Sequence, residues 1–191
     1  GGVAYIQYMA SLKSSESVYR ENSAAIGGCV SICCSDSSYE EAVISHQDIF
    51  QSNRADESGG AWCLHGANYG SGIRALINGS RFDANTAKRG GAIYFSHGYL
   101  SANFSYFVNN SASVGGGGAV SFYASSYPQY NDALDWTGSY HRCIFEGNRA
   151  LNATSGFGGA VMMTGLSQIH AFSNTDFTRN EAGLLGGAVM V

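Results

Sequence analysis

Two short motifs recur along this 191-residue chain, and they constrain its fold more than any other feature. The first motif is a double glycine followed by a short apolar run, and it begins at residues 1, 27, 59, 90, 117, 158 and 186. The second lies between successive copies of the first and has an aromatic residue, an asparagine three positions later and an alanine two positions beyond. Its aromatic residues are Tyr19, Phe50, Phe82, Phe107, Phe145 and Phe177, and its asparagines are Asn22, Asn53, Asn85, Asn110, Asn148 and Asn180. Self-similarity at periods of roughly 20 to 50 residues is typical of repeat architectures.

The spacing of apolar residues favours strands over helices. The second and fourth residues after the double glycine are apolar, as in Val30 and Ile32, while the residue between them varies. This alternation is typical of a short strand with one buried face. No segment shows apolar residues at helical spacing over ten or more positions, which excludes helical repeats. The 26 glycines and the single proline also favour short strands joined by tight turns.

The constancy of the motif residues favours stacked coils over a β-sandwich. A sandwich does not require the same residue at the same place in every strand pair, whereas stacked coils place equivalent residues about 4.8 Å apart. We therefore predict a right-handed parallel β-helix of about six to seven coils, with the hand taken from the general preference for right-handed crossovers. The aromatic residues would form an internal stack and the asparagines a hydrogen-bonded ladder at a turn. The glycines would permit unusual backbone angles or close approach, and the alanines would fit a tight corner.

The combination of GGA[IV] with FxxN, seen in FDANTA at residue 82 and GGAIYF at residue 90, resembles a known repeat family. It is similar to the repeat of the chlamydial polymorphic membrane proteins and to Pmp-like repeats elsewhere. The resemblance covers nearly the whole chain, from Gly1 to Val191. In that family the repeats form a surface-exposed β-helix used in adhesion, so the resemblance implies an extracellular or cell-surface location and an adhesive role.

We expect residues 1–191 to form a single β-helix segment without polar caps. The chain opens on one double glycine and closes six residues into another, and a solenoid with open ends exposes unpaired strand edges. The segment is therefore expected either to belong to a longer β-helix or to stack end to end with other copies, as in a filament. The net charge of -4 provides no basic surface, so nucleic acid is not expected as a partner. No apolar run approaches roughly 18 residues, so direct membrane insertion of this segment is not expected.

The longest connection between motifs, residues 123–142, is a candidate binding loop. Exposed tyrosine and tryptophan beside carboxylates suit the binding of a protein partner or a sugar ring, which makes surface glycans or cell-surface receptors candidate partners. The alternative is a loop that packs on itself and covers the coil. The candidate binding residues are Tyr127, Tyr130, Asp132, Asp135 and Trp136.

Four N-x-Ser/Thr sequons predict N-glycosylation if the protein passes through a glycosylating secretory pathway. They begin at Asn78, Asn103, Asn109 and Asn152. The asparagines of the repeated motif are all followed by x-Ala, so none of them is a sequon.

The five cysteines predict local disulfides rather than a metal site. Cys29, Cys33, Cys34 and Cys63 fall in two consecutive coils, and bonds between Cys29 and Cys33 or between Cys34 and Cys63 are the candidates. Paired CxxC boxes are absent, so zinc is not expected, and nothing points to another metal or cofactor. Cys143 lies where other coils carry serine or threonine, which predicts a small, buried, unpaired residue, although an odd count also allows an intermolecular bridge.

Polysaccharide lyases and hydrolases are the enzymatic alternative, because many parallel β-helices belong to these classes. The sequence NTD at Asn174 to Asp176 matches one short hydrolase motif, but no DD, GHG or RIK accompanies it. The histidines form no HExxH motif. We therefore predict no catalytic residues and expect a non-catalytic structural or adhesive β-helix that serves as a building block of a cell-surface or filamentous assembly. A carbohydrate-binding or polysaccharide-degrading β-helix is the alternative.

Overall fold

The computed structural model describes residues 1–7, 11–33, 42–66, 73–124, 137–165 and 169–191. All regular secondary structure in these residues is β-strand, and every strand pairing is parallel. The expected all-β class with parallel strands is thereby confirmed. Within the same residues there is no helix of the length and apolarity that crossing a membrane would require.

The described strands form four parallel sheets. The first sheet contains β1 (Ala4–Gln7), β5 (Val30–Cys33), β9 (Trp62–His65), β13 (Ile93–Ser96), β17 (Val120–Ala124), β21 (Val161–Gly165) and β25 (Val189–Met190). The second contains β2 (Leu12–Ser15), β6 (Ala42–His46), β10 (Ile73–Asn78), β14 (Gly98–Asn103), β18 (Thr137–His141) and β22 (Ile169–Ser173). The third contains β3 (Val18–Arg20), β7 (Ile49–Gln51), β11 (Arg81–Asp83), β15 (Tyr106–Val108), β19 (Ile144–Glu146) and β23 (Asp176–Thr178). The fourth contains β4 (Ser23–Ile26), β8 (Arg54–Ser58), β12 (Thr86–Ala87), β16 (Ser111–Ala112), β20 (Arg149–Ala150) and β24 (Glu181–Ala182).

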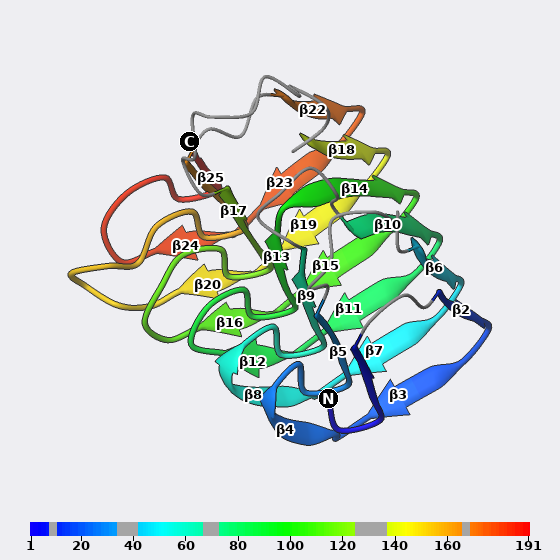
Figure 1. Ribbon diagram of the computed structural model, residues 1–191. Helices are drawn as coiled ribbons and strands as arrows, with labels where there is room; N and C mark the ends of the chain where they lie inside the picture. Colours follow the sequence, from blue (N-terminus) through cyan, green and yellow to red (C-terminus); the bar gives the residue numbers. More distant parts are fainter. Residues whose placement is uncertain (8–10, 34–41, 67–72, 125–136, 166–168) are drawn as a thin grey trace, which may run out of the picture.

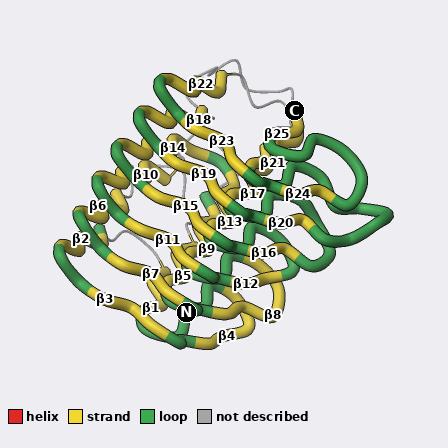
Figure 2. Tube along the Cα trace, turned by 180° about the vertical axis from the view of Figure 1, so that it is seen from behind, coloured by secondary structure: helices red, strands yellow, loops and turns green. Residues whose placement is uncertain are grey.

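The chain visits the four sheets in a fixed order and then returns to the first, and one such passage is called a round below. Each strand therefore pairs with the equivalent strand of the next round, as β1 pairs with β5 and β5 with β9. The rounds lie on one another from the N-terminus to the C-terminus, and the loops that lead from the fourth sheet back to the first protrude on one side (Figures 1 and 2).

The interior between the sheets is filled by the alternating apolar residues of the strands. In β9 and β13, Trp62, Leu64, Ile93 and Phe95 are buried in one continuous hydrophobic core. Register keeps equivalent residues together, because Trp62 pairs with Ile93 and Leu64 with Phe95. Apolar burial at about 25 cal/mol per Å² is the main stabilising term for such a core.

The two glycines of the repeated motif have different roles. The first has a positive φ, as in Gly90 (58°), a conformation that side chains with a Cβ rarely adopt. The second allows close approach between rounds, because a Cβ on Gly91 would overlap the carbonyl oxygen of Gly118. The alanines differ from expectation. Ala87 and Ala112 lie within the short strands of the fourth sheet and are buried there.

Candidate functional site: the asparagine ladder

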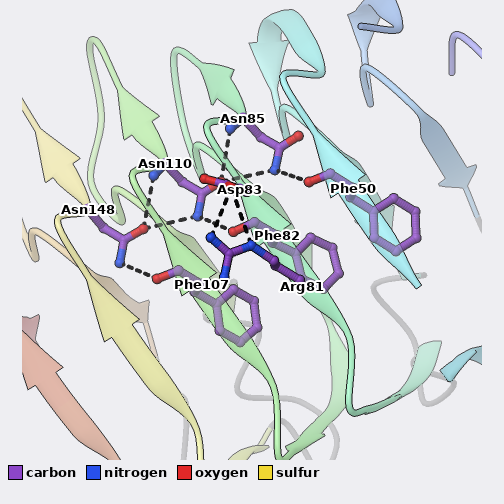
Figure 3. A network of polar contacts seen from close by, with 8 residues as sticks. All are labelled: Phe50, Arg81, Phe82, Asp83, Asn85, Phe107, Asn110 and Asn148. Carbon is purple, nitrogen blue, oxygen red and sulfur yellow. Dashed lines mark hydrogen bonds and ion pairs between the residues drawn. The ribbon is translucent and has the colours of Figure 1, made fainter. Parts of the chain in front are cut away.

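Register brings the six motif asparagines into a single column between the third and fourth sheets. The main-chain nitrogen and Nδ2 of Asn85 both donate to Oδ1 of Asn110, each at 3.0 Å, and Asn110 makes the same pair of bonds to Asn148. The pattern runs unbroken from Asn22 to Asn180. Figure 3 shows three of these side chains in line, with their amide groups pointing along the stack.

Each amide also donates backwards to the aromatic residue of the preceding round. Nδ2 of Asn85 donates to the carbonyl oxygen of Phe50 at 2.9 Å, and Nδ2 of Asn110 donates to that of Phe82 at the same distance (Figure 3). Both protons of Nδ2 and both lone pairs of Oδ1 are therefore used inside the fold. This matters because Asn53, Asn85, Asn110 and Asn148 are fully buried, where an unsatisfied amide would cost about 1–3 kcal/mol.

The ladder is directional. Each of Asn53, Asn85, Asn110 and Asn148 accepts from the round before it and donates Nδ2 and its main-chain nitrogen to the round after it. Toward the preceding round a round presents the Asn Oδ1 acceptor and one Nδ2 donor, and toward the next round it presents the Asn main-chain and Nδ2 donors and the carbonyl acceptor of its aromatic residue. The two faces of a round are therefore complementary to each other.

The motif aromatic residues form a second column beside the ladder. Neighbouring rings from Tyr19 to Phe177 lie 4.7 to 5.1 Å apart between centroids and within 13° of parallel. Trp62 adds edge contacts to the rings of Phe50 and Phe82. The strand spacing of about 4.8 Å sets this separation, so stacking follows from register.

A further polar column occupies the turn between the second and third sheets, two residues before each aromatic. The main-chain nitrogen of Ser80 donates to Oγ of Ser105 at 3.2 Å, and Ser105 Oγ donates to the carbonyl oxygen of Asn103 at 2.7 Å. Cys143 and Thr175 continue the column. The sequence shows that Ser, Thr, Cys and Asp recur at this position. The structure shows that their side chains form hydrogen bonds within the turn and between rounds.

Asp48 is the exception in that column, because it places a carboxylate where other rounds have a small polar residue. Its side chain is 1% exposed, and among the described residues no other Asp or Glu is buried. Oδ1 accepts from Ser14 Oγ at 3.0 Å and from the nitrogen of Ser17 at 2.9 Å, while Oδ2 accepts from Ser45 Oγ at 2.6 Å. The repeated motifs alone did not predict a buried carboxylate at this position.

The candidate binding residues Tyr127, Tyr130, Asp132, Asp135 and Trp136 lie outside the described residues. The strands that flank them, β17 and β18, belong to the first and second sheets.

The structure places the four sequon asparagines at the surface or partly exposed. Asn78 and Asn103 end neighbouring strands of the second sheet and are register partners. Asn109 is exposed at the turn after β15 with a φ of 52°. Asn152 lies in a protruding loop, where its Oδ1 accepts from the nitrogens of Thr154 and Ser155.

The candidate disulfides are not formed, since Cys29, Cys33 and Cys63 are free thiols and Cys34 lies outside the described residues. Cys29 faces the core directly before β5, and Cys33 ends that strand. Four residues of extended chain span about 13 Å, whereas the Cα atoms of a disulfide lie within about 7 Å. The Cys29–Cys33 pairing is therefore wrong. Cys143 is also free and 1% exposed, and its thiol donates to the carbonyl oxygen of Ala102 at 3.3 Å.

The carboxylate of the NTD segment has no other carboxylate in its column. Asp176 is exposed and pairs with Ile144, which pairs in turn with Tyr106. In the described part of the chain, no three His, Cys, Asp or Glu side chains are grouped so that they could hold a metal ion.

Comparisons of the chain with protein-family models, with curated proteins and with solved structures found no match.

Proposed function

We propose that the chain is a right-handed parallel β-helix and serves as a non-catalytic structural or adhesive element of an extracellular or cell-surface assembly. The four parallel sheets and their fixed visiting order support the solenoid. The Pmp-like motifs support the surface location and the adhesive role. The accessible sequons at Asn78 and Asn109 are compatible with secretion through a glycosylating pathway.

The observation that carries this proposal is the directional asparagine ladder. The constant residues of each round contact their equivalents in the next round. Asn85 is hydrogen-bonded to Asn110, and the ring of Phe82 stacks on that of Phe107. Because the forward face of one round is complementary to the backward face of another, rounds from an adjoining segment or from a second copy can extend the stack. Such head-to-tail contacts do not close on themselves and generate filaments.

Stacking between copies is tested by a charge placed on the free edge of the first round. Ala4 faces inward and is half-buried, while its neighbour Tyr5 faces outward and is 61% exposed. In Ala4→Lys the long side chain can reach water while the edge is free, so the single chain still folds. A further round on that edge would bury the ammonium group without a partner, which is strongly unfavourable.

We expect the 191-residue chain to form head-to-tail oligomers that grow with concentration in sedimentation velocity and appear as rods in electron micrographs. Ala4→Lys should abolish this growth, and the matched Tyr5→Lys control should retain it. A chain that stays monomeric at high concentration, or equal assembly of both variants, would contradict stacking between copies.

A further inference from the structure

Asp48 is the only buried Asp or Glu among the described residues, and three donors from two rounds hold its carboxylate. Ser14 and Ser17 belong to the first round, and Ser45 belongs to the same round as Asp48. Tyr19 extends the network, because its hydroxyl lies 2.7 Å from Ser14 Oγ. Since Ser14 donates to Asp48, the tyrosine hydroxyl is left to donate to Ser14.

The third round joins the same network. Ser80 Oγ lies 2.9 Å from Ser45 Oγ and accepts from the main-chain nitrogen of Asp48 at 3.2 Å. The donors to the carboxylate come from two rounds, and the hydrogen-bond network around it extends over three consecutive rounds.

Apart from the hydroxyl of Tyr140, equivalent positions in the described rounds beyond the second offer no side-chain donor. Ser14 and Ser45 occupy one inward-facing column of the second sheet, and register continues that column through Ile77, Ala102, Tyr140 and Phe172. Tyr19 is the only tyrosine of the aromatic column, whose other members are phenylalanines. A round with Ile77 or Phe172 in place of Ser14 would set a hydrocarbon against the carboxylate.

We propose that Asp48 makes the packing of the first round on the second selective, so that only a round carrying the Ser14 and Tyr19 hydroxyls is accepted there. This inference rests on the proposed head-to-tail packing and adds a specificity that the ladder lacks. The asparagine ladder joins any round to any other, because its donors and acceptors are the same throughout. A buried polar group that must find its partners is a known means of specifying register.

The test exchanges the first round's donors for the residues of the third round. The double variant Ser14→Ile with Tyr19→Phe leaves Asp48 facing an apolar side chain. Adding Asp48→Ser, the residue found in the third and fourth rounds as Ser80 and Ser105, should restore compatibility. The single variant Tyr19→Phe is the matched control, because it removes the hydroxyl group and keeps both the aromatic ring and Ser14.

The readout is hydrogen exchange of amides that join the first round to the second. The nitrogens of Glu21 and Asn22 donate to Gln51 O and Asn53 Oδ1. In the double variant we expect these amides to exchange about tenfold to a hundredfold faster, because the buried carboxylate loses the Ser14 donor and faces a hydrocarbon instead. The amides of Asn85 and Asn110 should keep their protection against exchange. In the triple variant with Asp48→Ser, the amides of Glu21 and Asn22 should regain the protection that they have in the unmodified protein.

Unchanged exchange at Glu21 and Asn22 in the double variant would overturn the proposal. So would a triple variant as poorly protected as the double variant, because the loss would then come from the substitutions themselves. Exchange is measured within one molecule, so this outcome is separate from whether copies assemble in the Ala4→Lys experiment.

Discussion

The side-chain oxygen of Asn110 accepts two hydrogen bonds from Asn85, one from its main-chain nitrogen and one from Nδ2, each 3.0 Å long. The same geometry recurs from round to round, although the loops between the asparagines differ in length. The contact therefore belongs to the stack and not to one segment, and it gives the ladder a direction, because each Oδ1 accepts only from the preceding round.

Asn110→Asp should be strongly destabilising. Nδ2 of Asn110 donates to Phe82 O and to Asn148 Oδ1, and an aspartate would set a carboxylate oxygen against both. An uncompensated buried charge typically costs about 3–5 kcal/mol, and we expect a loss of that size in denaturant unfolding. The neighbouring Asn109→Asp, at an exposed position, should change stability by less than about 0.5 kcal/mol. Similar losses for the two variants would show that the ladder contributes little.

Replacing an aromatic residue by alanine should lower the stability of the fold most at the centre of the aromatic column. Phe107 is fully buried between the rings of Phe82 and Phe145, and Phe107→Ala should cost about 3–5 kcal/mol through lost burial and a cavity. Phe177 is only half-buried, so Phe177→Ala should cost distinctly less. Thermal unfolding of the two variants measures the difference. A larger loss at Phe177 would mean that stability does not follow burial along the column.

Two glycines should respond differently to alanine. A Cβ on Gly91 would overlap the Gly118 carbonyl oxygen and come within 2.5 Å of the nitrogen of Ser111, so Gly91→Ala should cost more than about 4 kcal/mol or prevent folding. At Gly79 the Cβ would meet only Gln47 Cγ at 3.3 Å, and the main penalty is the positive φ of 65°. Gly79→Ala should therefore cost about 1–2 kcal/mol. Soluble yield and urea midpoints distinguish them, and a well-folded Gly91→Ala protein would refute the close approach between rounds.

Stability should fall in alkaline solution because buried thiols resist ionisation. Burial raises the pKa of Cys143 from 9.0 to about 11, and it raises the pKa of Cys63 to about 12. The unfolded chain loses these protons first, so the contribution is intact below pH 9 and decreases as pH rises toward the folded pKa. Between pH 9 and the pKa of each thiol in the folded protein, each thiol should lower the free energy of unfolding by about 1.4 kcal/mol per pH unit.

Cys143→Ser should remove the part of this slope that Cys143 contributes. Serine occupies the same column in other rounds as Ser80 and Ser105, so the hydrogen bonds at the turn can be kept. Urea unfolding between pH 8 and 11 measures the slope for both proteins. Identical slopes would mean that Cys143 ionises as easily in the fold as in the unfolded chain.

Much of the fold was predictable because residues at equivalent positions of the repeat become pairing partners in neighbouring strands. The positions of Phe82 and Phe107 relative to their glycine pairs predicted that they would be neighbours, and their rings stack. The alternation at Ile93 and Phe95 predicted a strand with a buried face. The corner expected at Ala87 was wrong, because a two-residue strand cannot be recognised by alternation. The Cys29–Cys33 pairing failed because proximity in sequence was taken for proximity in an extended strand.

By itself, the sequence determined the period, the parallel strands and which residues recur in each column, since these follow from local pattern and from the constancy of the motif. Only the tertiary structure decided the direction of the asparagine bonds, the use of the small polar column and the partners of Asp48. The contacts between rounds join residues far apart in the sequence, as Asp48 joins Ser14 across 34 positions and Asn110 joins Asn148 across 38. The hydrogen bonds of Asp48 depend on side chains that come from three different rounds and meet at one point. The sequence of a single repeat does not show which side chains these are.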